Sequence, residues 1–143
     1  MTLRLSRLAS CAVCCLVFAA GARAGQTLRV EPGKWEIRIE SKSSLQPQPQ
    51  VRTLTECVTE NEFDPDKLME GVEGCSVSDV TSSADRLQWK LRCALGGGEM
   101  TGEADYRSQG DTVEGAMHIA MQAGGMSMTM DHAYTGKRVG DCE

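Results

Sequence analysis

The chain has 143 residues, with 15 basic and 20 acidic side chains, 7 cysteines, 8 methionines, 2 tryptophans, 2 tyrosines and 2 phenylalanines. That length leaves room for one ordinary domain. With 24% charged and 4% aromatic residues, the composition is that of a globular protein and excludes a membrane-embedded bundle or a disordered tail.

The first 24 residues have the features of a secretory signal peptide. Arg4 and Arg7 give a basic start, Leu8 to Ala20 is apolar, and Ala22-Arg23-Ala24 supplies a small-x-small cleavage pattern. The apolar run is too short to cross a bilayer of about 30 Å as a helix, and no later segment is apolar enough to do so. We therefore expect residues 1–24 to be removed and the protein to be exported without a transmembrane segment.

A lipid anchor is the alternative to free export. Leu8-Ala9-Ser10-Cys11 has the form of a lipoprotein cleavage box. Such a box should follow the apolar region, whereas here it precedes it. The sequence therefore argues against lipid anchoring on Cys11.

Cleavage changes both the charge and the cysteine content. The remaining residues carry 12 basic and 20 acidic side chains, a net charge of −8, which opposes binding to nucleic acid or to anionic lipid. Four cysteines remain: Cys57, Cys75, Cys93 and Cys142. An even number of cysteines in an exported chain predicts two disulfides.

Alternation of apolar and polar residues dominates the rest of the chain and predicts half-buried antiparallel strands. The strongest alternation covers residues 35–39, 87–93, 100–106, 113–121 and 126–134, and weaker strands are expected at about 50–57 and 75–81. Turn residues separate these runs at 82–86, 96–98, 108–111 and 122–125.

Two segments depart from this pattern. The alternating Gln and Pro of residues 46–50 are expected to form an extended linker. Thr59 followed by Glu62, and then Asp64-Pro65, predict a short helix near 59–70. The predicted fold is all-β, in one domain over residues 25–143. It is an antiparallel meander of about seven strands that forms a curved sheet or an up-and-down barrel.

Hairpin geometry predicts the cysteine pairing. If the loop at 82–86 is centred on Ala84, Cys75 lies directly opposite Cys93, at a Cβ separation of about 4.5–5.5 Å that suits a disulfide. Cys57 is then left for Cys142. Of the three pairings that four cysteines allow, we therefore predict Cys75–Cys93 and Cys57–Cys142.

The last three predicted strands can be aligned in the same way. Centring one hairpin on Gln109/Gly110 pairs Tyr106 with Val113, and centring the next on Ala123/Gly124 pairs Met121 with Met126. Both alignments place the apolar residues on one face, and a slip of one residue would move them to the other face.

Several short motifs occur in the order found in a known family. They are PGKWE at 32–36, ECVT at 56–59, Gly74-Cys75, Trp89, Cys93, GGGEMTG at 96–102, Gly110-Asp111 and GKRVGDC at 136–142. The chain resembles an uncharacterised exported bacterial family, the domain of unknown function thirty-six seventeen, over essentially all of residues 30–142. The resemblance implies a periplasmic protein with paired cysteines and no assigned activity.

Methionines are the most unusual feature of the predicted apolar face. Thioethers are soft ligands that suit Cu(I), and a histidine continues their row. The metal ligands would then be Met126, Met128, Met130 and His132. The alternative, which the alternating positions favour, is that the methionines fill the core, because their flexible side chains pack irregular gaps.

Small residues on the same face leave unfilled volume. In a curled sheet this volume would form a ligand cavity, lined by Gly102, Ala104, Gly115, Met117, Met130, His132 and Tyr134. The other interpretation is that the glycines relieve crowding by bulky neighbours or allow the strands to bend. His118 is expected on the outward face, in solvent.

No motif for catalysis or for cofactor binding occurs in the sequence. Both disulfides together use every remaining cysteine, and two histidines on opposite faces do not make a zinc site. We therefore expect no catalytic residues and no cofactor. The predicted function is a non-enzymatic binding or structural module in the periplasm, with a small apolar ligand or another periplasmic protein as partner. Copper handling and an uncharacterised enzymatic activity remain as alternatives.

Overall fold

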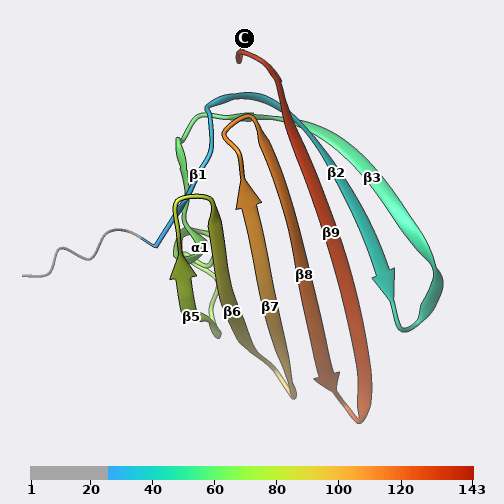
Figure 1. The fold of residues 1–143 in the computed structure, drawn as a ribbon. Helices are drawn as coiled ribbons and strands as arrows, with labels where there is room; N and C mark the ends of the chain where they lie inside the picture. Colours follow the sequence, from blue (N-terminus) through green and yellow to red (C-terminus); the bar gives the residue numbers. More distant parts are fainter. Residues whose placement is uncertain (1–25) are drawn as a thin grey trace, which may run out of the picture.

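The computed structural model describes residues 26–143, so the expected signal peptide and Cys11 lie outside the described residues. The described part contains short and long strands and one helical turn (Figure 1). In chain order these are β1 (Leu28–Arg29), β2 (Gly33–Ser43), β3 (Gln46–Val58), β4 (Glu62–Phe63), α1 (Pro65–Leu68), β5 (Cys75–Ser82), β6 (Arg86–Leu95), β7 (Gly98–Ser108), β8 (Thr112–Ala123) and β9 (Met126–Gly140).

Seven strands form one antiparallel sheet in the order β3-β2-β9-β8-β7-β6-β5, and β1 pairs with β4 in a separate two-stranded piece. The predicted meander is present from β5 to β9. The β2–β3 hairpin then joins the sheet through pairing of β2 with β9. Because β3 and β5 are the two edges of this order, the fold is the curved sheet of the prediction and not its barrel alternative.

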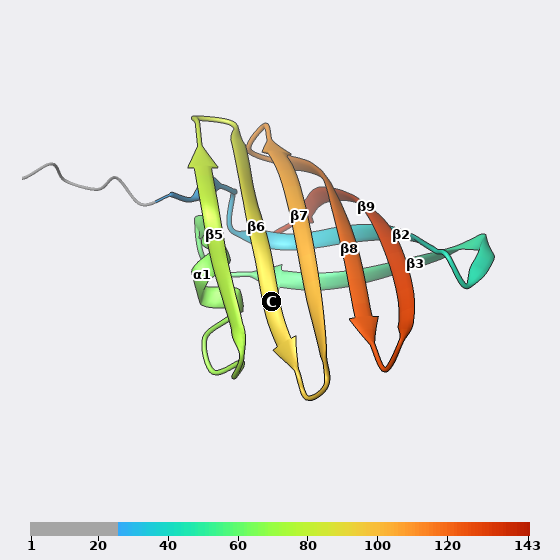
Figure 2. The same cartoon turned by 90° about the horizontal axis from the view of Figure 1, so that it is seen from below.

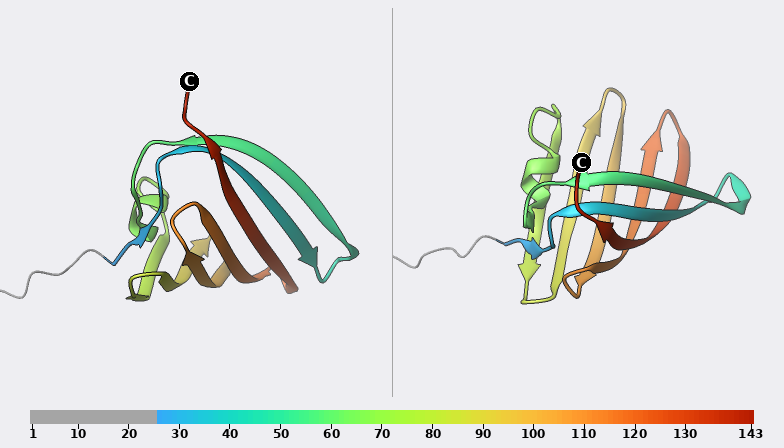
Figure 3. Two further views of the ribbon diagram at one scale, coloured as in Figure 1. Left: turned by 45° about the horizontal axis from the view of Figure 1, so that its top comes forward. Right: turned by 90° about the horizontal axis from the view of Figure 1, so that it is seen from above.

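The sheet curls so strongly that the β2–β3 hairpin lies across its other strands. Figure 2 shows β2 and β3 running at a steep angle behind β5 to β8, and the right-hand view in Figure 3, from the opposite side, shows the same crossing. The sheet therefore has a concave side, with the hairpin as one wall and the meander as the other. Helix α1 and the β1–β4 piece lie at the end of this space, near β5 and β6 (Figure 1).

The core lies where the β1–β4 piece covers the concave side of the meander. Leu28 from β1 packs with Leu87, Trp89 and Ala104 from β6 and β7, and all four are buried. Phe63 from β4 adds an aromatic ring 5.6 Å from that of Trp89, centroid to centroid. The alternation in β6 that predicted these inward positions is thereby confirmed.

Both predicted disulfides are present. Cys75 and Cys93 face each other across β5 and β6, as the hairpin argument required, and Cys57 joins Cys142. The first bridge links neighbouring strands, whereas the second ties the end of β3 to the segment after β9. In the described residues no helix has the length and apolar character needed to cross a membrane.

Two hairpin alignments are wrong by two residues. Tyr106 pairs with Gly115 and not with Val113, and Met121 pairs with Met128 and not with Met126. In the second hairpin the turn is Gly124-Gly125, whose φ values of 59° and 82° suit a two-residue turn that needs positive φ at both positions. A shift of two leaves every side chain on its predicted face, so the assignment of faces survives the error.

Two local predictions also need correction. Residues 46–50 are not a linker, because β3 begins at Gln46 and its pairing with β2 includes Ser41 with Gln50. This strand lies at a sheet edge, where proline is tolerated. The helix is confined to Pro65–Leu68, and Asp64 caps its N-terminus through a carboxylate that accepts a hydrogen bond from the backbone N–H of Asp66. The Thr59 capping box does not form, since β4 follows that residue.

Candidate functional site

A cavity of about 740 Å³ lies between the β2–β3 hairpin and the meander. Strands β2 and β3 form one wall, strands β6 to β9 form the other, and β1, β4 and α1 close one end. The apolar and small residues of its lining are Leu28, Val30, Trp35, Ile37, Ile39, Leu54, Val58, Phe63, Leu68, Met69, Trp89, Leu91, Tyr106, Val113, Met117, Tyr134 and Gly136. The cavity is therefore mainly hydrophobic and aromatic, as small-molecule sites usually are.

Aromatic rings define the inner end of the cavity. Tyr106 lies 5.1 Å from Trp89, 6.0 Å from Phe63 and 5.5 Å from Tyr134, measured between ring centroids. Trp35 comes from the opposite wall and is 3% exposed. Both tryptophans of the chain thus line the same cavity.

The two tyrosines are the polar groups of this inner region. Burial raises the pKa of Tyr106 far above its usual value, and the neighbouring Tyr134 raises it further by charge repulsion and by a hydrogen bond. Tyr106 is therefore a neutral phenol throughout the physiological pH range. Its hydroxyl offers hydrogen bonding to a ligand but no charge.

Glycines of the predicted cavity make room for neighbouring side chains. A Cβ atom on Gly115 would lie 2.4 Å from Cδ1 of Tyr106, and one on Gly102 would lie 3.1 Å from Cε of Met117. Ala104 is buried in the core. The alternative in which small residues relieve crowding thus describes these positions. Of the predicted ligand-binding residues, Met117 and Tyr134 line the cavity.

Charged side chains gather where the lining is exposed. Arg52 and Glu56 on β3, and Glu60 and Glu62 after it, line the cavity and are all exposed. We call this exposed border along β3 and residues 59–62 the mouth. Lys67 on α1 binds Glu60 at 3.1 Å between Nζ and Oε2. The mouth is therefore polar while the interior is apolar.

His132 lies on the concave side but outside this lining. Its Nδ1 is 2.8 Å from Oγ of Ser41 on β2, and its ring centroid is 6.0 Å from that of Tyr134. His118 lies on the opposite face, where its Nδ1 is 2.6 Å from Oδ1 of Asp131. Each imidazole ring is thus held by a side chain on the adjacent strand.

The proposed copper ligands are spread along a single strand. Met126, Met128, Met130 and His132 alternate along β9, so that successive members are about 6.6 Å apart along the strand and the end members about 20 Å apart. Met126 is 76% exposed beside the Gly124-Gly125 turn. Among residues 26–143, no group of three or more His, Cys, Asp and Glu side chains could hold a metal ion. The copper set remains a prediction.

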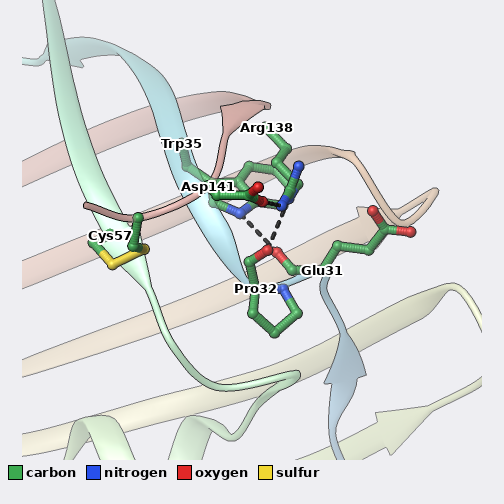
Figure 4. Close-up of polar contacts among 7 residues, drawn as sticks. Glu31, Pro32, Trp35, Cys57, Arg138 and Asp141 are labelled. Carbon is green, nitrogen blue, oxygen red and sulfur yellow. Dashed lines mark hydrogen bonds and ion pairs between the residues drawn. A yellow bond between two sulfur atoms is a disulfide. The ribbon is translucent and has the colours of Figure 1, made fainter.

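A cluster of contacts, which we call the clasp, joins the two ends of the domain beside the cavity (Figure 4). Arg138 donates a hydrogen bond from Nε to the carbonyl oxygen of Pro32 at 2.7 Å and also pairs with Asp141. Trp35 donates a hydrogen bond from its indole N–H to the carbonyl oxygen of Glu31 at 2.8 Å. The clasp thereby fixes the indole ring that forms part of the cavity wall.

The Cys57–Cys142 disulfide completes the clasp. Gly33 allows Arg138 to approach, because a Cβ atom there would lie 2.5 Å from Nε of Arg138 and the residue has a φ of +148°. The motifs at residues 32–36 and 136–142 therefore meet in space, together with Cys57 of a third motif.

The family model described as "Protein of unknown function (DUF3617)" matches residues 30–142. The chain belongs to this DUF3617 family. The match begins one residue before Glu31 and ends at Cys142, so it covers the whole unit that the clasp closes. Comparison of this DUF3617 protein with curated proteins and with solved structures finds no match.

Sequence reasoning missed the wall that β2 and β3 contribute to the cavity. The residues of that wall on β3 alternate with outward ones, a pattern that predicts only a weak strand at 50–57; they are Arg52, Leu54, Glu56 and Val58. The pairing of β2 with β9 joins opposite ends of the chain, and no local pattern reveals it. The small residues of the prediction lie on β7 and β8, in the wall opposite the hairpin.

Proposed function

We propose that this DUF3617 protein is an exported, non-enzymatic binding protein that holds a small apolar ligand between the β2–β3 hairpin and the meander. The observation that carries the proposal is the 740 Å³ cavity with its hydrophobic and aromatic lining. Ligand sites of soluble proteins typically have volumes of about 300–1,000 Å³ and a similar lining with few polar groups. Burial of apolar ligand surface there contributes about 25 cal/mol per Å².

The intrinsic fluorescence of the protein provides a direct test. Trp35 and Trp89 are its two tryptophans and both line the cavity. Titration with the apolar dye 1-N-phenylnaphthylamine should therefore change tryptophan emission in a saturable way, with enhanced dye emission at the same midpoint. Native mass spectrometry of the purified protein should show a one-to-one complex. An unchanged tryptophan spectrum and no complex would refute the proposal.

A matched pair of variants locates the binding. Leu54 is half-buried and lines the cavity, whereas the preceding residue, Thr53, is exposed on the other face of β3. Leu54→Arg places a charge in the cavity at a sheet edge and should weaken dye binding at least about ten-fold, because desolvating a charge is costly. Thr53→Arg carries the same added charge outside the cavity and should bind the dye normally.

Export is the second part of the proposal, and it is supported by the two disulfides as well as by the character of residues 1–24. Disulfides persist in oxidising compartments such as the periplasm. Expression of the full chain in a Gram-negative bacterium, followed by osmotic shock and intact-mass analysis, should release an oxidised protein beginning at Gly25. Retention in the cytoplasm with free thiols would refute export, and an acylated Cys11 would identify a lipoprotein.

A further inference from the structure

Arg52 occupies a special position in the mouth. Among the lining residues of the described chain it is the only basic one, and no ion pair or hydrogen bond in residues 26–143 involves its side chain. It pairs with Ile39 on β2, and Ile39 pairs in turn with Tyr134 on β9. Arg52 therefore lies in the same cross-strand row as the tyrosine pair at the inner end of the cavity.

The remainder of the mouth has the opposite charge. Glu56 lies four residues further along β3, about 13 Å away along the strand, and Glu60 and Glu62 follow it. Lys67 neutralises Glu60, whereas Glu56 and Glu62 have no ion-pair partner in the described part of the chain. One end of the mouth is thus positive and the other is negative, with an apolar interior between them.

We propose that the ligand is a single-chain carboxylic acid whose carboxylate binds Arg52 and whose apolar chain lies between Trp35 and Trp89. The inference rests on the proposed function of the cavity and specifies its ligand class. A guanidinium binds a carboxylate through two parallel N–H···O hydrogen bonds. The carboxylates at the other end repel the head group, so that they favour one orientation of the ligand.

The number of charges favours a carboxylate over a phosphate. One guanidinium balances one negative charge, whereas a phosphate monoester carries about two at neutral pH. With no second basic side chain in the described lining, the additional phosphate charge would face the acidic part of the mouth without compensation. A carboxylate is also favoured over an uncharged head group, because only a charged group forms charge-assisted hydrogen bonds with the free guanidinium of Arg52.

Four ligands with the same twelve-carbon chain test the inference: dodecanoate, 1-dodecanol, dodecyl phosphate and dodecyltrimethylammonium. Each displaces 1-N-phenylnaphthylamine from the oxidised protein at pH 8, below its critical micelle concentration. Dodecanoate should bind about ten-fold more tightly than 1-dodecanol, the scale expected for one charge-assisted interaction. Dodecyl phosphate and dodecyltrimethylammonium should both bind more weakly than dodecanoate.

Variants then assign the preference to one side chain. Arg52→Gln should remove the ten-fold advantage of dodecanoate and leave 1-dodecanol unchanged. Arg38→Gln is the matched control, because Arg38 lies on the neighbouring strand with its side chain on the opposite face, beside Glu40. It should retain the preference for dodecanoate. Retention of the preference in Arg52→Gln would overturn the role of Arg52.

The failure of the inference is distinguishable from the failure of the proposed function. Equal binding of dodecanoate and 1-dodecanol by the unaltered protein would overturn the carboxylate inference while leaving an apolar site. If dodecyltrimethylammonium binds most tightly, the carboxylate inference is also overturned, and the head group is assigned to the acidic end of the mouth. Absence of displacement by all four ligands, together with no dye binding, would overturn both.

Discussion

The guanidinium of Arg138 donates a hydrogen bond to the carbonyl oxygen of Pro32 at 2.7 Å and thereby joins segments 106 residues apart. The side chain of Arg138 is 27% exposed and also pairs with Asp141. It therefore connects the segment before β2 to the segment after β9. Because Trp35 is attached to the same corner by its bond to Glu31, the contact helps to position a wall of the cavity.

Replacement of Arg138 by methionine should lower the free energy of unfolding by about 1.5–3 kcal/mol, the usual contribution of a hydrogen bond to a charged group. Urea denaturation followed by circular dichroism measures the change, with an unaltered slope indicating a true loss of stability. Lys137→Met is the control, because Lys137 is an exposed neighbour on β9. If the free energy of unfolding falls equally in both variants, the contacts of Arg138 in the clasp do not stabilise the fold.

Gly115→Ala should destabilise the protein by about 1–3 kcal/mol, the range found for overpacking. The added methyl group would lie within 2.7 Å of three atoms of the Tyr106 ring, so the ring must move. Gly140→Ala on β9 is the control, since a Cβ atom there meets nothing within 4 Å. The tyrosine also lines the cavity, and Gly115→Ala should therefore weaken dye binding as well, a result that a purely local effect on folding would not produce.

The two disulfides should be reduced in a definite order. Cys57 and Cys142 are both exposed, whereas Cys93 is 1% exposed. Dithiothreitol should therefore open Cys57–Cys142 first, which peptide mapping after alkylation will show. In the loop-entropy account, opening this bridge over a separation of 85 residues costs about 4–5 kcal/mol. Prior loss of Cys75–Cys93 would contradict the order derived from burial.

Stability should decrease in acid partly through Asp105. The hydrogen bond from Arg86, at 2.8 Å between Nε and Oδ1, holds the pKa of this carboxyl below its ordinary value of 3.8. A lowered folded-state pKa gives a contribution that is present above 3.8 and is lost as the pH falls through the folded-state value. Both side chains are 39% exposed, so the contribution is modest.

Asp105→Asn should therefore reduce the difference in unfolding free energy between pH 6 and pH 3, measured by urea denaturation at each pH. The comparison variant is Glu103→Gln, which removes an exposed carboxylate without an ion-pair partner in the described residues. It should leave the acid dependence close to that of the unaltered protein. If Asp105→Asn and the unaltered protein lose the same unfolding free energy between pH 6 and pH 3, the Arg86–Asp105 pair does not contribute to the acid sensitivity.

Side-chain alternation allowed prediction of the faces, because in a strand the period of two assigns each residue to one side. It could not set the alignment of neighbouring strands, since a shift of two residues preserves every face. The β8–β9 turn shows what was needed: Gly124 and Gly125 both adopt positive φ, and a turn centred on this pair gives the observed pairing of Met121 with Met128. The Cys75–Cys93 pairing was correct because that hairpin is regular near the cysteines.

The cavity was harder to predict than the fold. Its second wall depends on pairing between β2 and β9, such as Ile37 with Gly136, which brings distant segments together. The charged mouth arises only when β3 folds across the meander. The sequence does show that Arg52 and Leu54 lie on one side of a strand, but the residues opposite them follow from the curl of the sheet.

The position of β9 between β2 and β8 has a consequence for how the molecule is made. The β2–β3 hairpin and strands β5 to β8 are all synthesised before β9, yet no strand joins them into one sheet until β9 follows. Contacts between such distant segments slow folding, and the uncovered surfaces are prone to aggregate meanwhile. A change in β9 is therefore expected to reduce the yield of folded protein more than it alters the properties of the molecules that do fold.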